Sequence, residues 1–253
     1  MAEALREAVK DDLEGLDGAA VMFSGGLDSS VLAVLARKHC PVTLYTLGDA
    51  GSSDLMQATE CAGILDLPLV SVTFTRQGIE ESIRDVVLRH GMARAKWMTT
   101  FVSFDLVMRK IRERHVLCGQ GADELFGGYR KYHASPEPRT QMDRDLATLA
   151  EEEMPMYRRL ASNYGKELLT PYLSLRVMHV AKELGAEPSA DGQWTKPLLR
   201  EAAAMLGVPG MMAQKPKKAM QYGSGVSAEL RRLLKGLGTD LDGYIHSVVE
   251  LGK

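Results

Sequence analysis

SGGLDSS, residues 24–30, directly follows a short apolar run at residues 19–23 and opens a segment of helical length. This order of strand, glycine turn and helix is typical of the first unit of an α/β fold. Gly25 and Gly26 allow a tight backbone turn, so that backbone N–H groups and the helix N-terminus can meet an anion. Hydroxyl groups add further donors, at Ser24, Ser29 and Ser30. The stretch therefore predicts a phosphate-binding loop.

The same loop carries a carboxylate, Asp28, which a simple anion site would not contain. A carboxylate beside phosphates repels them unless a cation lies between the two, so Asp28 indicates a bound Mg²⁺. The loop lacks the lysine of GxxxxGK[ST] and the third glycine of GxGxxG, which excludes the Walker and dinucleotide-binding fingerprints. The alternative interpretation is a strand-to-helix connection that binds no ligand.

Outward from this loop, strand-like and helix-like segments alternate as far as Asp123. After the first strand, runs rich in β-branched and other apolar residues lie at 42–47, 68–74 and 116–117. Segments of helical length lie between and beside them, at 29–38, 54–65, 79–90 and 101–114. This alternation predicts right-handed crossovers and a doubly wound, mostly parallel sheet of the α/β class, whose ligands bind beyond the carboxyl ends of the strands.

After about Tyr129 the strand signals stop, and the remaining periodic segments are helical. They lie at 143–153, 157–164, 175–184, 196–206 and 228–234. The pattern predicts three parts. An N-terminal helical extension covers residues 1–18, a nucleotide-binding α/β core covers 19–130, and a helical C-terminal lobe that completes the active site covers 131–253.

The composition is that of a globular chain of 253 residues, 45% of them apolar and 25% charged. The 31 Lys and Arg residues nearly balance the 33 Asp and Glu residues, which argues against a non-specific nucleic-acid binder. No apolar run approaches the roughly 20 residues of a membrane helix, and the start carries no apolar signal-peptide core. The 3 cysteines have no CxxC or zinc-ligand spacing and are expected to be buried. We expect a cytoplasmic protein without nucleic-acid or membrane partners.

A second glycine-rich stretch, CGQGADELFGGY at residues 118–129, follows the fourth expected strand. Glycines at a strand end permit a ligand to approach closely, and Asp123 supplies a second carboxylate at the same sheet edge as Asp28. Two carboxylates from separate loops suit a Mg²⁺ ion that bridges phosphate oxygens. The alternative interpretation is a glycine-rich turn in which Asp123 caps a helix.

Both stretches resemble motifs of a known family. SGGLDSS resembles the pyrophosphate loop (PP-loop) of the ATP pyrophosphatases, which cleave ATP between its α and β phosphates. CGQGADELFGGY is similar to the SGEGxDExFGGY stretch of asparagine synthetases. The resemblance runs over about residues 19–226 and implies a PP-loop fold of the adenine nucleotide α-hydrolase-like, Rossmann-like type, with ATP and Mg²⁺ as cofactors.

The resemblance also implies roles for individual residues. Adenosine contacts fall on Met22, Leu47, Cys118 and Gly119. The PP-loop, residues 24–30, would hold the phosphates, and Asp28 and Asp123 would hold Mg²⁺.

Two further family patterns lie in the C-terminal half. Family members carry a lysine six residues before a GxG turn, where it stabilises charge on the phosphates during adenylation. Counting back from GSG at 223–225 gives Lys217, and its neighbour Lys218 is a nucleotide-binding candidate that takes over if the loop register shifts. GKELLTPYL at 165–173 is similar to the family stretch GVExRxPFLD and implies a catalytic role for Glu167.

The sequence departs from the family pattern at several positions. Gln120 replaces the glutamate of SGEG, which is linked to the acyl-adenylate, and an amide cannot act as a general base at neutral pH. The pair Thr99 and Thr100 is not followed by the arginine that recognises aspartate in the family. The three glutamates at 151–153 are interpreted as a solvated helix face, with a substrate role as the alternative.

These observations predict an enzyme in which a carboxylate is adenylated by ATP and then captured by ammonia or an amine, with release of AMP and pyrophosphate. The chain begins Met1-Ala2 rather than with the cysteine of a glutaminase domain, so we expect ammonia from solution, from a separate glutaminase partner, or replacement by another amine. The alternatives are an ammonia-dependent ligase like NAD synthetase, and a non-catalytic ATP-binding regulatory subunit, which Gln120 favours. A tRNA thiolase is opposed by the charge balance. The oligomeric state stays open, a homo-oligomer included.

Overall fold

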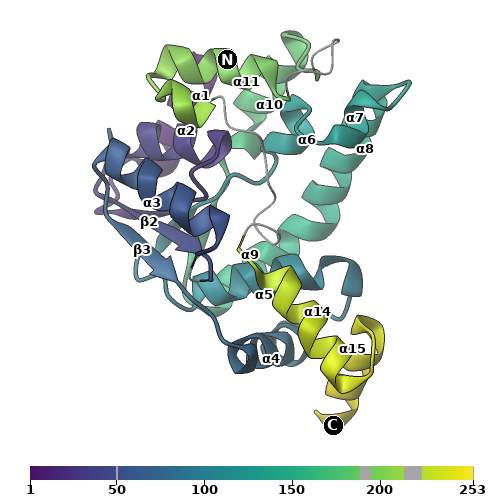
Figure 1. The fold of residues 1–253 in the computed structure, drawn as a ribbon. Helices are drawn as coiled ribbons and strands as arrows, with labels where there is room; N and C mark the ends of the chain where they lie inside the picture. Colours follow the sequence, from purple (N-terminus) through teal and green to yellow (C-terminus); the bar gives the residue numbers. More distant parts are fainter. Residues whose placement is uncertain (50, 189–194, 214–223, 253) are drawn as a thin grey trace.

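The computed structural model of the protein describes residues 1–49, 51–188, 195–213 and 224–252. Their centre is a sheet of five parallel strands in the order β3-β2-β1-β4-β5 (Figure 1). The strands are β1 (Ala19–Met22), β2 (Val42–Leu47), β3 (Leu69–Val72), β4 (His115–Leu117) and β5 (Glu167–Leu169). The first strand is central and the chain winds outward from it in both directions, so the predicted doubly wound parallel sheet is confirmed.

Helices cover both faces of the sheet and form two separate cores (Figure 1). The first core holds buried residues of α1 (Ala2–Leu13), α2 (Leu27–Ala36), α3 (Ser53–Leu65), α10 (Leu175–Glu183) and α11 (Pro197–Leu206). The second holds those of α4 (Arg76–Arg84), α5 (Ala95–Met108), α9 (Met154–Asn163), α14 (Val226–Leu237) and α15 (Leu241–Leu251). Strand β1 supplies Ala19 and Val21 to the first core, and Ala20 and Met22 to the second. Because alternate side chains enter opposite cores, this strand is apolar throughout.

Shorter elements connect these layers. They are α6 (Ala122–Phe126), α7 (Arg130–His133), α8 (Pro138–Thr148), α12 (Gly210–Ala213), the π-helical turns η1 (Asp85–Arg89) and η2 (Leu149–Glu153), and the 3₁₀ turn η3 (Pro171–Leu173). The turn η2 joins α8 to α9, so that residues 138–163 form one nearly continuous helical segment. Single π turns inside helices often occur at functional sites, which directs attention to η2.

Strand β5 lies in the C-terminal half, where the sequence predicted helices alone. It pairs in parallel with β4, with His115 opposite Glu167 and Leu117 opposite Leu169. The expectation that strands end before residue 130 is therefore wrong. Three residues are too few to show a period of two, and their extended conformation depends on pairing with β4 rather than on local preference.

The N-terminal segment forms α1. Its buried residues Leu5, Val9 and Leu13 belong to the first core, so α1 completes the layer that covers one face of the sheet. The helix expected at 101–114 is α5, which begins earlier, at Ala95, because Trp97 and Met98 extend its buried face.

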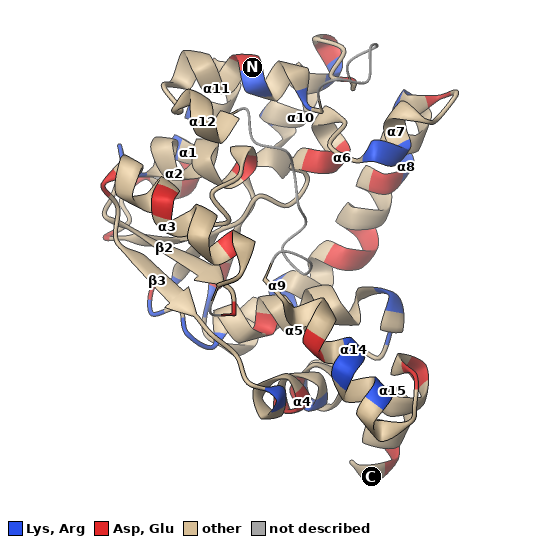
Figure 2. Ribbon diagram, viewed as in Figure 1, with Lys and Arg blue, Asp and Glu red and all other residues tan. Residues whose placement is uncertain are grey.

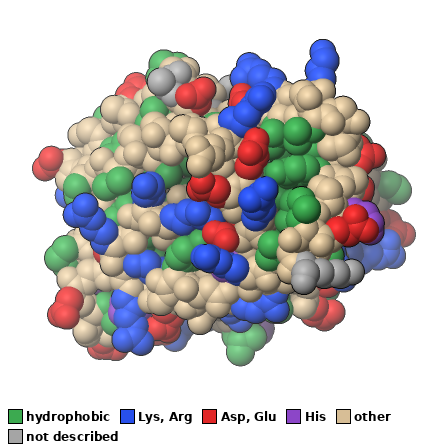
Figure 3. Space-filling model, turned by 90° about the horizontal axis from the view of Figure 1, so that it is seen from below, with side chains coloured by type: hydrophobic (Ala, Val, Ile, Leu, Met, Phe, Trp, Pro, Cys, Tyr) green, Lys and Arg blue, Asp and Glu red, His purple; other side chains and the backbone are tan. Residues whose placement is uncertain are grey.

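Acidic and basic residues are interspersed along the helices (Figure 2), and side chains of both signs mix on the face viewed in Figure 3. This pattern agrees with the nearly balanced charge of the whole chain. Within the described ranges, no helix combines the length and the apolar character required to cross a lipid bilayer.

Candidate active site

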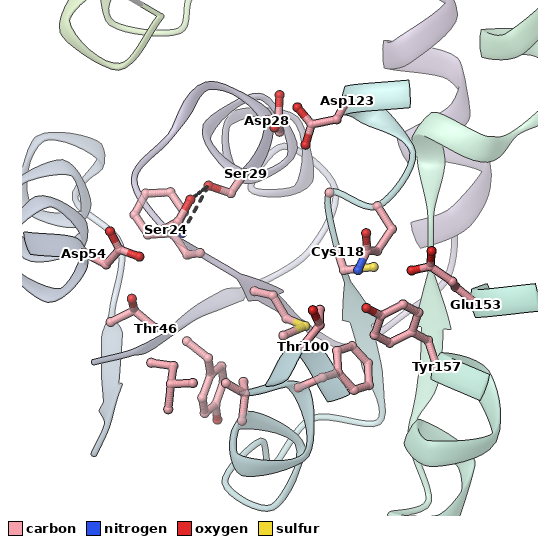
Figure 4. Close-up of a pocket in the computed structure, with 18 of the residues that line it drawn as sticks. Ser24, Asp28, Ser29, Thr46, Asp54, Thr100, Cys118, Asp123, Glu153 and Tyr157 are labelled. Carbon is pink, nitrogen blue, oxygen red and sulfur yellow. Dashed lines mark hydrogen bonds between the residues drawn. The ribbon is translucent and has the colours of Figure 1, made fainter. Parts of the chain in front are cut away.

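A pocket with a volume of about 270 Å³ opens at the carboxyl ends of β1, β2 and β4 (Figure 4). Residues that end or follow these strands line it, namely Met22, Phe23, Thr46, Leu47, Cys118 and Gly119. Parallel strands bring their carboxyl ends to one sheet edge, so loops far apart in the sequence meet here. This is the position at which open α/β sheets bind ligands.

The PP-loop forms one wall of this pocket, and its glycines are needed for its shape. Gly25 has a φ of 69°, and a Cβ there would lie 3.0 Å from the Gln57 carbonyl oxygen and 3.2 Å from Cys61 Sγ of α3. The turn is held by the backbone N–H of Ser24, which donates to Ser29 Oγ at 3.2 Å, and by Gln57 Nε2, which donates to the Gly25 carbonyl at 2.9 Å. The loop is thus fastened to α3 while its hydroxyl-bearing side lines the pocket.

Asp28 and Asp123 come together beside this loop, as the motifs predicted. Asp28 lies in the first turn of α2 and Asp123 in the first turn of α6, and their side chains lie near one another in Figure 4. A third residue joins them: Lys196 Nζ lies 2.5 Å from Asp28 Oδ2 and 2.8 Å from Asp123 Oδ1. Lys196 is 2% exposed. Burial lowers the pKa of its ammonium group, and the charge of Asp28 raises it in part.

Sequence reasoning missed Lys196. It lies directly before α11, 168 residues after Asp28, and belongs to none of the motifs. Its backbone adopts the left-handed conformation, with φ 56° and ψ 49°, which residues other than glycine rarely adopt. The only available signal was that Lys196 begins the segment predicted to be helical at 196–206, directly before a proline, and this pattern occurs too widely to indicate a site.

Two neighbours of the carboxylates explain residues whose purpose the motifs left open. A Cβ at Gly128 would overlap both the Asp123 carboxylate and the Lys196 side chain, so the second glycine of FGGY makes room for this ion pair. The Tyr172 hydroxyl donates to the Asp28 carbonyl at 2.9 Å, and Tyr172 is fully buried. The Tyr172 hydrogen bond therefore fixes the backbone at Asp28, and Gly128 leaves space beside Asp123.

The residues present fit a Mg²⁺ ion at this position. Asp28 Oδ1 is buried and has no hydrogen-bond partner among the described residues, so one carboxylate oxygen is left to bind a cation. Mg²⁺ in nucleotide sites commonly takes one or two carboxylates, with phosphate oxygens and water completing its shell. The described part of the chain contains no group of three or more Asp, Glu, His or Cys residues arranged to hold a metal.

Another wall of the pocket is built from Gln120, Glu124, Tyr129, Glu153 and Tyr157. Glu124 accepts a hydrogen bond of 2.7 Å from the Tyr129 hydroxyl, and burial raises the pKa of this carboxyl group. Glu153 comes from the turn η2, and its side chain lies beside Tyr157 in Figure 4. Burial also raises the pKa of Glu153, which Lys96 lowers in part.

The three glutamates at 151–153 do not share one environment. Glu151 and Glu152 are exposed, whereas Glu153 is half-buried and lines the pocket. The interpretation of the whole run as a solvated face is therefore wrong for Glu153, because the π turn rotates it toward the cavity. Of the neighbouring threonine pair, Thr100 lines the pocket.

The structure brings most of the predicted residues together. Those that line the pocket are Met22, Ser24, Asp28, Ser29, Leu47, Cys118, Gly119, Gln120 and Asp123. Ser30 is fully buried behind the loop that Gly25 and Gly26 form. Cys118 is a buried thiol whose pKa burial raises to about 12, so it is no thiolate at neutral pH, and the other cysteines are buried as expected. Lys217 and Lys218 lie outside the described residues.

Glu167 is not brought to the pocket. It is the first residue of β5, at the amino end of the sheet, and its side chain is 59% exposed with Oε2 3.6 Å from His115 Nε2. Because the strands are parallel, a residue that begins β5 lies at the edge opposite the pocket. The catalytic role that the resemblance implied for Glu167 is not supported by this position.

Comparisons with known proteins find relatives among asparagine synthetases. The chain is 28% identical to a putative glutamine-hydrolysing asparagine synthetase of Methanocaldococcus jannaschii, over 93% of this chain and 51% of the relative. It is 27% identical to the glutamine-hydrolysing asparagine synthetase B of Escherichia coli K12, over 89% of this chain and 45% of that protein. The chain therefore spans about half the length of these relatives.

Matches to solved structures have lower sequence identity. NMN synthetase from Francisella tularensis matches with a TM-score of 0.45 and 14% identity, over 99% of this chain and 87% of that one. A U34-tRNA thiolase from Methanococcus maripaludis matches with a TM-score of 0.38 and 14% identity, over 99% and 78%. The family model for asparagine synthase matches residues 1–165 and 140–249, which together include nearly all of the sequence. The chain belongs to the asparagine synthase family.

Proposed function

We propose that the protein is an ATP-dependent, AMP-forming carbon–nitrogen ligase. It would adenylate a carboxylate substrate and transfer the acyl group to ammonia or an amine, releasing pyrophosphate and then AMP. The observation that carries this proposal is the meeting of the PP-loop with Asp28 and Asp123 at the edge of the pocket. The binding of a nucleoside triphosphate with Mg²⁺ requires a loop that can hold phosphates and carboxylates that can hold the metal.

The lining of the pocket suggests where each part of ATP would bind. Apolar surface at Met22 and Leu47, together with the backbone at Gly119, suits adenosine. The PP-loop would hold the β and γ phosphates, and Mg²⁺ held by Asp28 and Asp123 would neutralise their charge. This arrangement leaves the α phosphorus directed toward the rest of the pocket.

In the first step, a carboxylate oxygen of the substrate attacks the α phosphorus, and the bond to the oxygen that bridges the α and β phosphates breaks. Pyrophosphate leaves with the electron pair of that bond, and Lys217 is the residue that we propose stabilises the developing charge. In the second step, the amine nitrogen attacks the acyl carbon, AMP leaves and the nitrogen loses a proton. Gln120 cannot accept that proton, but its amide can orient the intermediate.

We assign the proton to Glu153. Its carboxylate lines the same part of the pocket as Gln120 and Tyr157, and burial raises its pKa, which makes the carboxylate a stronger base. The proposal specifies the substrate as a carboxylic acid and the nitrogen source as ammonia or an amine. Ammonia could enter from solution or from a separate glutaminase chain, or an amine could replace it.

A second candidate function is a non-catalytic ATP-binding regulatory subunit, because Gln120 replaces the glutamate of the family motif. The two candidates are separated by measuring AMP and pyrophosphate from Mg·ATP with a panel of carboxylic acids, each with and without ammonium. Acid-dependent AMP that falls at least tenfold in Lys217→Ala supports the ligase. Calorimetric binding of Mg·ATP without AMP from any acid supports the regulatory subunit, and rates within twofold in both Lys217→Ala and Asp28→Ala contradict the ligase.

A further inference from the structure

Lys196 is a buried cation that forms ion pairs with both predicted metal ligands, Asp28 and Asp123. Its ammonium group lies 2.5 Å from Asp28 and 2.8 Å from Asp123, so the lysine itself occupies the gap between the two carboxylates. The three residues come from α2, α6 and the residue before α11. An ammonium that is 2% exposed is costly unless it is paired, and here two carboxylates pair with it.

The backbone around Lys196 is built to hold it in this position. Asp66 and Lys196 are the non-glycine residues with positive φ in the described ranges, and Asp66 merely ends a helix. Lys196 also precedes Pro197, which disfavours a helical backbone at the preceding residue. Arg200 Nε donates to the Thr195 carbonyl at 2.7 Å and holds the preceding peptide. A strained backbone of this kind persists where the surroundings impose it, and it is concentrated at functional sites.

Space for the lysine is also reserved. A Cβ at Gly128 would overlap Lys196 Cε, so the glycine at this motif position leaves room for the end of the lysine side chain. The backbone conformation, the burial and this space each favour a lysine ammonium at this position.

We propose that Lys196 is a resident counter-ion that makes the binding of Mg²⁺ depend on the polyphosphate. This inference rests on the proposed function, because it takes Asp28 and Asp123 as the metal ligands. Without nucleotide, the ammonium balances one of the two carboxylate charges and opposes Mg²⁺ by repulsion at short range. With a bound polyphosphate, Mg²⁺ takes the carboxylates and Lys196 pairs with phosphate oxygens.

The charges support this exchange. Two carboxylates with Lys196 carry a net charge of −1, whereas adding Mg²⁺ makes the group +1, which is favourable only beside an anion. Mg²⁺ and pyrophosphate would therefore each raise the affinity of the other, and linkage requires the two effects to be equal. The protein would avoid binding the free metal and would hold it when the nucleotide arrives.

The test measures binding without turnover, in the full chain. Calorimetry gives the affinity for Mg²⁺ alone, and then for Mg²⁺ with saturating inorganic pyrophosphate, in the wild type, Lys196→Met and Lys196→Gln. The control is Lys182→Met, which removes the same charge from an exposed position of α10. We expect Lys196→Met to bind Mg²⁺ alone at least tenfold more tightly, and its enhancement by pyrophosphate to fall at least tenfold.

A purely structural lysine gives a different result. In that case Lys196→Met and Lys196→Gln lower the melting temperature and leave the affinity for Mg²⁺ alone within twofold, which overturns the proposal. Equal weakening of Mg²⁺ and pyrophosphate binding also overturns it. If Lys196→Met does not fold, Lys196→Gln decides, because it keeps a polar end between the carboxylates. AMP formation is measured separately, so a failure of the ligase proposal is distinguishable from a failure of this one.

Discussion

Two carboxylates in this protein, one fully buried and one partly buried, have opposite surroundings. Asp105 of α5 is fully buried and accepts hydrogen bonds from Ser82 Oγ at 2.7 Å, Arg109 Nε at 2.7 Å and the Tyr164 hydroxyl at 2.6 Å. Asp28 pairs with Lys196, but its Oδ1 has no hydrogen-bond partner among the described residues, and it borders the pocket.

The difference separates a structural charge from a functional one. Around Asp105, both carboxylate oxygens have donors, which ties α5 to α4 and to the end of α9. The Asp28 carboxylate has one oxygen without a hydrogen-bond partner among the described residues, next to a cavity. An unsatisfied polar atom lowers the stability of the protein without ligand, and a bound cation would satisfy it. Substitutions should therefore affect folding at the first cluster and chemistry at the second.

The largest expected effect is on folding, at Asp105. Asp105→Ala leaves Arg109 and the Tyr164 hydroxyl with fewer partners in a buried place, so the free energy of unfolding should fall by about 3–5 kcal/mol. Urea denaturation measures this change. Asp143→Ala, at the surface pair with Arg139, is the control and should cost about 0.5 kcal/mol or less. A loss below 1 kcal/mol at Asp105 would remove the basis of the comparison.

Asp28→Asn should affect activity more than folding, the opposite of Asp105→Ala. Removing one carboxylate charge from the proposed Mg²⁺ site should slow AMP formation by about 10²–10³-fold, as expected when one preorganised electrostatic contact is lost. The amide fits the same volume and Asp123 still pairs with the buried Lys196 ammonium, so the loss of stability should be smaller than in Asp105→Ala. The assay is acid-dependent AMP release under saturating Mg·ATP. Equal rates in the variant and the wild type would show that this carboxylate has no part in the chemistry.

Glu153→Gln tests the second step of the proposed reaction. We expect amide formation to fall about 100-fold, because general bases commonly contribute 10²–10⁴-fold, while exchange of labelled pyrophosphate into ATP stays within threefold. Glu152→Gln is a matched control, because Glu152 is exposed and pairs with Arg94. Parallel losses of exchange and amide formation in Glu153→Gln would mean that Glu153 acts in substrate binding instead.

Two tyrosines allow a smaller version of the comparison. The Tyr164 hydroxyl donates to the Asp105 carboxylate, and the Tyr172 hydroxyl donates to the Asp28 carbonyl. Hydrogen bonds to charged groups are worth more, so Tyr164→Phe should cost about 1.5–3 kcal/mol of unfolding free energy and Tyr172→Phe about 1 kcal/mol. Denaturant titration of both variants gives the order, and an equal cost would contradict the assignment of Asp105 as the stabilising charge.

The smallest effect concerns pH and His90, whose Nε2 lies 3.8 Å from Asp105 Oδ1. Burial lowers the pKa of His90 below its ordinary value of 6.5, so the unfolded chain binds a proton more readily than the folded one. The contribution of neutral His90 to stability is therefore present above about pH 6.5 and is lost as the pH falls below it. Urea titrations at pH 5.5 and 7.5 give the free energies of unfolding of the wild type and His90→Gln. The advantage of the wild type over the variant should be smaller at pH 5.5 than at pH 7.5. A constant difference would contradict the lowered pKa.

Much of the site was predictable because its motifs are local. Gly25 needs its positive φ within a turn of a few residues, and Asp28 follows at a set distance on the first helix turn, so spacing alone indicated a phosphate loop. The same holds for Asp123, which opens a short helix directly after β4. In both cases the chemistry lies where a strand ends, and the strand pattern was visible in the sequence.

Other parts depended on contacts between distant segments. Strand β5 exists because three residues pair with β4, and the resemblance misled at Glu167 because a shared motif does not state which edge of the sheet its residue occupies. Glu153 reaches the pocket through a π turn, whose register differs from the helical period used to read the run of glutamates.

The amino-acid sequence by itself determined the alternation of strands and helices as far as β4, the two glycine-rich loops and the family, since each of these depends on residues close together in the chain. The tertiary structure alone decided that Lys196 lies between Asp28 and Asp123 and that Asp105 is fully satisfied. Burial makes a charge costly, and whether a charge is paired depends on which side chains surround it in space. That information is absent from any short stretch of sequence, because the partner of Asp28 lies 168 residues away.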